Sequence, residues 1–185
     1  MSTSTTHARR LHDVEGPPMP MVAMDAAEPV PAPLYDLSTL DLTKTVVTLE
    51  ELQKILPQRH EFEQLHSVIH IDPVADVIVG RREVRTGEFW EHTMAGGPAA
   101  LPPMLLLEYA AQLAAYWGMV RQPHMGFVGF AKCDKLGVYG QVHAPSMVYM
   151  IAKVVSIKPR RVVAQCQAIC RGKVVFGVIV TGMSV

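Results

Sequence analysis

Apolar and polar residues follow two different periods along this chain. Between about Pro103 and Met119, apolar side chains occupy nearly every face of a helical repeat, as in a helix that other structure encloses. From Gly126 onward the residues alternate with the two-residue period of half-buried strands. These strands are expected at 126–132, 147–157, 162–170 and 173–180. The Arg171-Gly172-Lys173 sequence predicts a tight turn between the last two.

Two further elements are expected before the apolar helix. Thr48 and Glu51 have the spacing of a capping box, which predicts a short helix that ends at Pro57. Residues 62–85 alternate on both sides of Asp72-Pro73, a pattern that is typical of a β-hairpin. The chain is therefore expected to be an α+β protein, with one enclosed helix and about five or six mostly antiparallel strands.

The first part of the chain has a different composition. Residues 1–42 contain six prolines among Ser, Thr, Met and Ala, which excludes a periodic helix and offers little to bury. We expect an extended or disordered arm over 1–42 and a single domain over 43–185. The end of the arm, Leu34 to Leu42, is more apolar than a linker. It could dock on the domain or on a neighbouring subunit.

Composition excludes several classes of protein. The 185 residues are 49% hydrophobic and 18% charged with no net charge, so no overall field favours nucleic acid or an anionic membrane as a partner. Cys133, Cys166 and Cys170 lack the spacing of a disulfide framework or a zinc site, and we expect neither metal nor cofactor. With no signal-peptide pattern and no long apolar run, a cytoplasmic location is expected.

Glu108 is the most informative residue, because its carboxyl group lies in the most apolar stretch of the chain. Burying it unpaired would cost several kcal/mol or raise its pKa until it became neutral. Gln112, one helical turn later, shares its face and can orient the carboxyl group. Glu108 is therefore either a structural carboxylate held by specific partners or a group kept for chemistry.

Four motifs resemble the 3-hydroxyacyl-[acyl-carrier-protein] dehydratases of the FabZ type, and they fall in the same order over roughly residues 48–185. The motifs are Leu49-Glu-Glu-Leu-Gln-Lys-Ile-Leu-Pro-Gln-Arg-His-Glu-Phe62, Phe89-Trp-Glu-His-Thr-Met-Ala-Gly-Gly-Pro98, Leu101-Pro-Pro-Met-Leu-Leu-Leu-Glu-Tyr-Ala-Ala-Gln112 and Val142-His-Ala-Pro-Ser146. The resemblance implies a hot-dog fold, in which a curled antiparallel sheet wraps around the central helix. It also implies a homodimer or higher homo-oligomer, and acyl carrier protein as the partner that presents the thioester.

The resemblance also implies roles for particular residues. In these dehydratases a histidine before the helix abstracts the α proton, and the helix glutamate serves the leaving hydroxyl from the opposite subunit. Carried over, His92 and Glu108 are the catalytic pair and Gln112 supports Glu108. The distance along the chain from His92 to Glu108 is longer than in the family. Alignment on the preceding aromatic pair places Thr93 in the histidine position, and Gly97 belongs to the turn before the helix.

Three positions depart from the family pattern. Pro103 stands where the family has a glycine whose N–H faces the thioester oxygen, and proline has no N–H to donate. Losing one such donor costs on the order of 100- to 1000-fold in rate. Gln58 replaces a histidine of the first motif, and His66 replaces an aspartate.

Three functions remain open. The first is dehydration of a 3-hydroxyacyl group in a fatty-acid-like, polyketide or other secondary-metabolite pathway. The second is thioester hydrolysis, with Glu108 activating water. The third is a non-catalytic subunit that binds an acyl carrier or supports a paralogous hot-dog partner. A basic cluster at Lys158, Arg160 and Arg161 is either a landing patch for an acidic carrier or a solvated turn.

Overall fold

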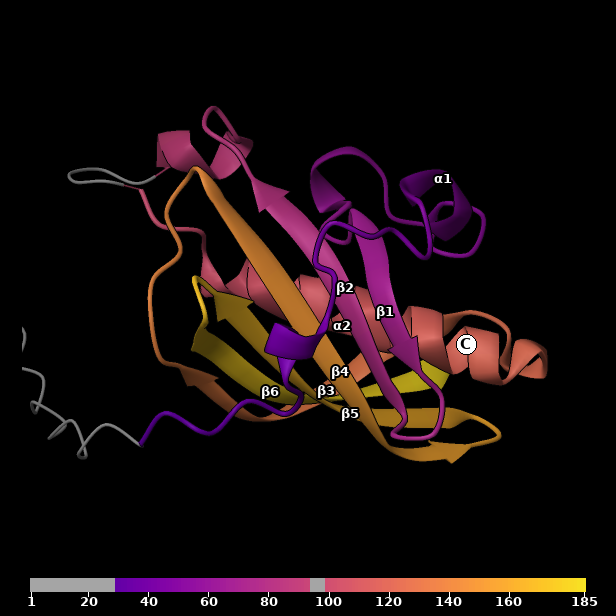
Figure 1. The fold of residues 1–185 in the computed structure, drawn as a ribbon. Coiled ribbons are helices and arrows are strands. Elements are labelled where there is room, and N and C mark those ends of the chain that lie inside the picture. The colour runs from indigo at the N-terminus through magenta and orange to yellow at the C-terminus, as the bar shows by residue number, and fades with distance from the viewer. Residues whose placement is uncertain (1–28, 94–98) are drawn as a thin grey trace, which may run out of the picture.

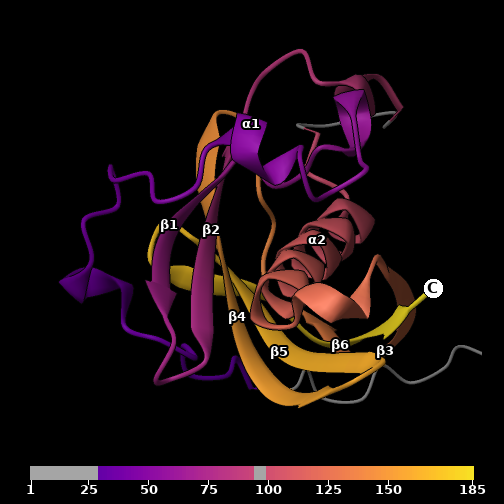
Figure 2. The same cartoon turned by 90° about the vertical axis from the view of Figure 1, so that its right-hand side faces the viewer.

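The computed structural model describes residues 29–93 and 99–185, with the backbone alone at His92 and Thr93. Its strands are β1 (Ser67–Asp72), β2 (Val77–Val84), β3 (Val128–Val138), β4 (Ser146–Lys158), β5 (Arg161–Cys170) and β6 (Lys173–Ser184). Its helices are η1 (Leu37–Thr39), α1 (Leu49–Leu52), η2 (His60–Phe62), η3 (Phe89–Thr93), α2 (Pro103–Arg121) and η4 (Pro123–Met125). The strands form one antiparallel sheet in the order β1-β2-β4-β5-β6-β3, which curls around α2 (Figures 1 and 2).

Helix α2 is the centre of the core, as the sequence predicted. It begins at Pro103, a position where the missing N–H costs nothing because the first helical N–H groups have no partner within the helix. Side chains on most of its faces are buried, and it packs against strands β2 to β6. No helix of the described residues has the length and apolar content needed to cross a bilayer.

Both predicted hairpins are confirmed, and local chemistry explains each turn. In the β1–β2 turn, Asp72 Oδ1 accepts hydrogen bonds from the N–H groups of Val74 at 3.0 Å and Ala75 at 2.9 Å. In the β5–β6 turn, Arg171 and Gly172 have φ values of 50° and 73°. Two consecutive positive φ values match the twist of the flanking strands, which is why a glycine is found there.

Three elements differ in length from their predictions, the first of them β6, which runs to Ser184 instead of residue 180. The capping box at Thr48 and Glu51 is present, but α1 is a single turn, and an irregular segment follows it to Pro57. Strand β3 extends to Val138, well beyond the predicted residue 132. Its register against β6 shifts between Phe130 and Lys132 and again between Asp134 and Gly137. Such bulges interrupt the two-residue alternation, so the pattern alone hides the second half of the strand.

The end of the arm, residues 29–42, lies on the outer face of the sheet, on the side away from α2 (Figure 2). There it covers a second apolar cluster formed by Ile69, Val77, Val79, Ile151, Ile169 and Val174. The arm residues that pack on this cluster are Leu34, Tyr35, Leu37, Leu40 and Leu42. The apolar end of the arm is thus docked on its own domain.

Candidate functional site

Glu108 and Gln112 project from the same side of α2 and are hydrogen-bonded. Gln112 Nε2 donates to Glu108 Oε1 at 2.8 Å and also to the carbonyl of Phe62. Its Oε1 accepts the N–H groups of Gln64 at 3.0 Å and Leu65 at 3.1 Å. Two backbone donors on one side of the amide settle which end is oxygen. Gln112, only 2% exposed, therefore ties the Glu108 carboxyl group to the segment before β1.

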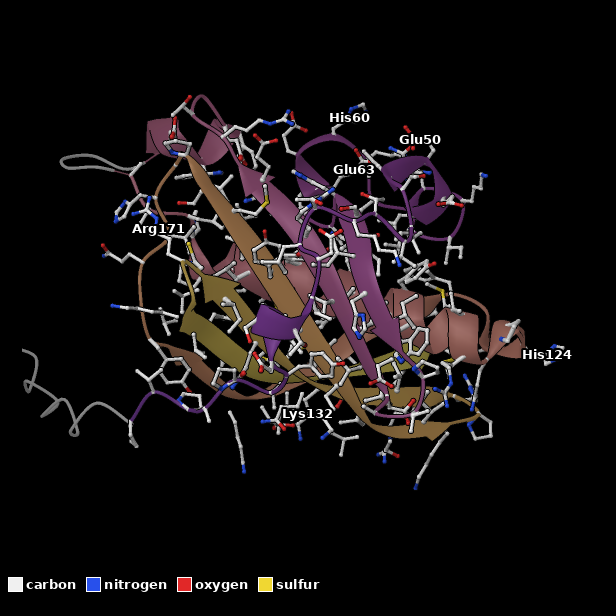
Figure 3. The ribbon with its side chains drawn as sticks, viewed as in Figure 1. Glu50, His60, Glu63, His124, Lys132 and Arg171 are labelled. Atoms are coloured by element: carbon white, nitrogen blue, oxygen red, sulfur yellow. The ribbon has the colours of Figure 1, made fainter. Side chains whose placement is uncertain are left out.

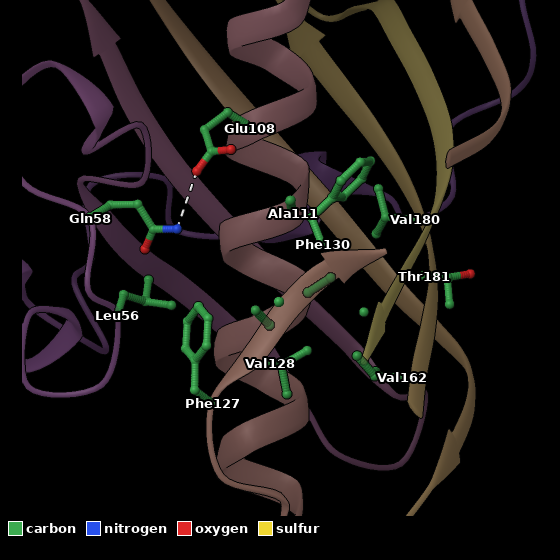
Figure 4. Close-up of a pocket in the computed structure, with 14 residues that line it drawn as sticks. Leu56, Gln58, Glu108, Ala111, Phe127, Val128, Phe130, Val162, Val180 and Thr181 are labelled. Atoms are coloured by element: carbon green, nitrogen blue, oxygen red, sulfur yellow. Dashed lines mark hydrogen bonds between the residues drawn. The ribbon is translucent and has the colours of Figure 1, made fainter. Parts of the chain in front are cut away.

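A second amide reaches the same carboxylate oxygen. Gln58 Nε2 donates to Glu108 Oε1 at 3.2 Å (Figure 4). The loop that carries Gln58 is held by the Arg59 guanidinium, which donates to the carbonyls of Gln53, Leu56 and Gln58 at 2.6 to 2.7 Å. In the sequence, Gln58 stands out only as the replacement of a histidine. Its position in the first motif was the one signal that it belongs to the site.

The Glu108 carboxyl group opens onto a small cleft, here called the Glu108 cleft. Water-sized molecules have about 50 Å³ of space in it. The cleft lies between α2, the loop at Leu56 and Gln58, the start of β3, and strands β5 and β6 (Figure 4). Its other lining residues are Ala111, Ala114, Ala115, Phe127, Val128, Gly129, Phe130, Val162, Val180, Thr181 and Gly182.

The described lining residues of the cleft give the Glu108 carboxyl group hydrogen bonds but no countercharge. Among the described residues that line it, Glu108 is the only ionisable one, so no cation neutralises the carboxylate there. Both amides bind Oε1, and none of the described residues donates a hydrogen bond to Oε2. Gln58 Oε1 is buried and likewise has no partner in the described ranges. The cleft thus offers two acceptor oxygens, one of which can carry a proton.

No family model matches this chain, and no curated protein matches it. Solved structures do match. The ApeI:P dehydratase heterocomplex of Xenorhabdus doucetiae is similar with a TM-score of 0.60 and 13% identity, over 72% of this chain and 90% of that one. A thioesterase from Haemophilus influenzae has a TM-score of 0.57 and 16% identity, over 76% of this chain and 92% of that one. A putative thioesterase related to phenylacetic acid degradation, from Ralstonia eutropha, has a TM-score of 0.53 and 10% identity, over 63% of this chain and 82% of that one.

This chain has the hot-dog fold. Identities this low establish the fold alone, and hot-dog proteins similar to the chain include both a dehydratase and thioesterases. The predicted architecture, a curled antiparallel sheet around one central helix, is confirmed.

The predicted partner of Glu108 stays a prediction. Helix η3 includes the backbone of His92 and Thr93, but their side chains and Gly97 lie outside the described residues. The structure therefore brings Glu108 and Gln112 together and leaves the position of the imidazole untested.

The start of η3 is anchored by a buried ion pair that sequence reasoning missed. The Arg82 guanidinium, 2% exposed, binds Glu88 Oε2, and the Trp90 indole N–H donates to the same oxygen at 3.0 Å. Glu88 Oε1 accepts the N–H of Arg85 at 2.7 Å. Burial lowers the pKa of Arg82, while the charge of Glu88 opposes this shift. The alternation of β2 turns Arg81 outward and Arg82 inward, and this pattern was the sequence signal that Arg82 is buried.

Three further histidines, His60, His66 and His70, lie outside the Glu108 cleft. His66 is half-buried, and its Nδ1 accepts the N–H of Glu83 at 3.3 Å. Burial lowers the pKa of His66, and the positive charge of Arg82 lowers it further. His70 contacts Tyr35 of the arm, and His60 is exposed (Figure 3). In the described ranges, no group of His, Cys, Asp and Glu side chains could hold a metal ion.

Packing or solvent exposure explains several other aromatic, thiol and basic side chains. Tyr109, Tyr116 and Trp117 are buried core residues of α2, and burial raises the pKa of both tyrosines. Cys166 and Cys170 are buried, whereas Cys133 is exposed. The basic cluster at Lys158, Arg160 and Arg161 lies at the exposed β4–β5 turn.

Proposed function

We propose that this hot-dog protein is a dehydratase that removes water from a 3-hydroxyacyl thioester carried on acyl carrier protein. The observation that carries the proposal is the Glu108 carboxyl group, which lines a mostly apolar cleft, is held at Oε1 by two amides and has no donor to Oε2 among the described residues. The motifs that resemble FabZ-type dehydratases support it, as does the structural likeness to a dehydratase heterocomplex.

In the proposed reaction, a base removes the proton from carbon 2 of the acyl chain, and its electron pair forms the double bond between carbons 2 and 3. The bond from carbon 3 to the hydroxyl oxygen breaks, and protonated Glu108 delivers its proton so that water leaves. Because Gln58 and Gln112 both occupy Oε1, the proton is held on Oε2. The product is a 2-enoyl thioester. His92 is the proposed base, carried over from the family resemblance.

The free edge of β3 supports a homodimer. Strand β3 pairs with β6 on one side only and ends the sheet. Phe130, Leu136 and Val138 on this strand are exposed, and its first residues line the Glu108 cleft. An unpaired strand edge is a template for a second chain. We propose antiparallel β3–β3 pairing of two copies, which brings a second subunit to each cleft. A paralogous hot-dog chain is the alternative occupant of this edge.

The reaction is tested with 3-hydroxyacyl groups loaded on the phosphopantetheine of an acyl carrier protein, by following loss of water in the mass of the acyl carrier. Glu108→Gln keeps the shape of the side chain and removes its acidity, so the rate should fall by about 100- to 10,000-fold. Glu50→Gln is the matched control, because Glu50 is exposed on the outside of α1 (Figure 3). A Glu108→Gln enzyme that dehydrates at the unaltered rate removes Glu108 from the reaction and refutes the proposal.

Thioester hydrolysis is the second candidate, and the composition of the cleft favours it. Gln58 stands where the family has a histidine, and Glu108 is the only ionisable group among the described lining residues. A carboxylate in this setting could activate a water molecule by itself. Release of free thiol without an enoyl product identifies hydrolysis. Saturable acyl-carrier binding with neither product identifies a non-catalytic subunit.

A further inference from the structure

The Glu108 cleft continues along α2, beyond the carboxyl group. Ala111 and Ala115 follow Glu108 on nearly the same side of the helix, so the cleft extends for about two turns toward the C-terminal end of α2. Beyond Glu108, the described residues with which α2 lines the cleft are all alanines. Strands β3, β5 and β6 form the opposite wall (Figure 4). This part of the cleft is therefore suited to an alkyl chain.

The end of the cleft farthest from Glu108 is closed by two buried valines. Val128 of β3 and Val162 of β5 lie there and are 3% and 1% exposed (Figure 4). Val162 packs on the backbone of α2, since a Cβ atom added to Gly118 would lie 3.3 Å from its Cβ, Cγ1 and Cγ2. A Cβ atom added to Gly182 of β6 would lie 2.5 Å from Val128 Cγ1 and 3.1 Å from Val162 Cγ1. An alkyl chain therefore meets a wall at these contacts.

The space between Glu108 and this wall is small. The cleft has about 50 Å³ for water-sized groups. One such group needs about 10–15 Å³, so about four fit, and a methylene group is close to water in size. Val128 and Val162 are buried by their own chain, so the wall does not depend on a second subunit. The cleft thus sets an upper limit on the length of an acyl chain.

We propose that Val162 limits the acyl group of the substrate to about six carbon atoms. This inference rests on the proposed function, in which carbon 3 and its hydroxyl group lie beside the Glu108 carboxyl group. Carbons 1 and 2 then lie toward the mouth, and about four carbon atoms, from carbon 3 onward, fill the cleft. A groove with an open end would behave differently, because each added methylene would tighten binding by about four-fold.

The test measures dissociation constants of acyl pantetheine amides, in which an N–H group replaces the thioester sulfur. The acyl groups carry no hydroxyl group on carbon 3, so these probes cannot be dehydrated, and the amide resists hydrolysis. The hexanoyl probe should bind more tightly than the butyryl probe. The decanoyl probe should bind at least about ten-fold more weakly than the hexanoyl probe, because its last carbon atoms find no apolar space.

Two variants change the length of the cleft in opposite directions. Val162→Ala should open its end and bring decanoyl binding to within about two-fold of hexanoyl binding, or tighter. Ala115→Leu should weaken hexanoyl binding by at least about ten-fold and change butyryl binding by less than about two-fold. Val178→Ala is the matched control, because Val178 is buried in the same core, at 3% exposed, and does not line the cleft. It should keep the preference of the unaltered protein.

Equal or tighter binding of the decanoyl probe by the unaltered protein overturns the proposal, as does the absence of saturable binding of every probe. A Val162→Ala variant that discriminates against decanoyl as strongly as Val178→Ala also overturns it. The proposed reaction is tested separately, with carrier-bound 3-hydroxyacyl groups. If the probes show the limit and no 3-hydroxyacyl group loses water, the limit stands and the dehydratase function is wrong. If 3-hydroxybutyryl and 3-hydroxydecanoyl groups lose water at equal rates, the function stands and the limit is wrong.

Discussion

The side-chain amide of Gln112 lies 2.8 Å from Oε1 of Glu108, one helical turn away, and its own oxygen is bonded to the backbone of Gln64 and Leu65. The carboxyl group is thus positioned by an amide that four hydrogen bonds hold in place. A preorganised group of this kind loses little entropy when it meets a substrate. The arrangement makes Gln112 a structural residue and a positioning residue at the same time.

Gln112→Ala should therefore destabilise the fold as well as the site. The buried N–H of Leu65 loses its acceptor, whereas the N–H of Gln64 keeps the carbonyl of Phe62 at 3.0 Å. Since one unsatisfied buried donor costs about 1–3 kcal/mol, the free energy of unfolding in urea should fall by about that amount. Gln141→Ala, at an exposed position, should leave it unchanged. If Gln112→Ala lowers the free energy of unfolding no more than Gln141→Ala does, the Gln112 amide is not buried as described.

Gln58→Ala should lower activity with little effect on stability. Gln58 is half-buried and supplies one of the two hydrogen bonds to Glu108 Oε1. We expect kcat for the thioester reaction to fall by about ten-fold, which corresponds to about 1.4 kcal/mol. Gln122→Ala, beyond the far end of α2, is the control. Equal rates for Gln58→Ala and the unaltered protein would exclude Gln58 from the site.

Removing one partner of the Arg82–Glu88 pair should lower the free energy of unfolding strongly. Replacing both partners should lower it much less. Glu88→Leu leaves the Arg82 charge buried without its partner, which typically costs about 3–5 kcal/mol. The double variant Arg82→Met/Glu88→Leu removes the charge together with the partner and should recover most of that loss. Denaturant unfolding of Arg82→Met, of Glu88→Leu and of the double variant measures the coupling free energy between the two side chains. Losses that simply add would argue against a buried ion pair.

The stability of the protein should fall as pH is lowered through the histidine range, in part because of His66. Burial lowers the pKa of His66 below its ordinary value of 6.5, so the unfolded chain binds its proton more readily than the folded one. The contribution of His66 is complete above about pH 6.5 and is lost as pH falls below that value.

His66→Asn, which keeps an acceptor for the Glu83 N–H, should flatten this part of the pH dependence. Urea midpoints measured between about pH 5 and 7.5 provide the comparison. His124→Asn changes an exposed histidine (Figure 3) and should follow the unaltered protein. If the urea midpoint of His66→Asn depends on pH as steeply as that of the unaltered protein, this pH dependence comes from other groups.

Local patterns predicted the main helix, the strands and two of the hairpins. The enclosed helix, the capping box and both hairpin turns depend on residues two to four apart, whose interactions the order of the chain determines directly. The i, i+4 relation of Glu108 and Gln112 belongs to the same class. The length of β3 was missed because its bulges break the alternation on which such a prediction depends.

The sequence by itself determined that a carboxyl group lies in the central helix and that an amide shares its face. Only the tertiary structure decided what completes the site, since Gln58 and Gln64 are 50 and 48 residues away from their partners on α2. Tertiary structure likewise decided the burial of Arg82 and the docking of Leu34 against Gln167, which is 133 residues away. Contacts at such separations follow from the curl of the sheet and the close packing of the core, which no local period encodes.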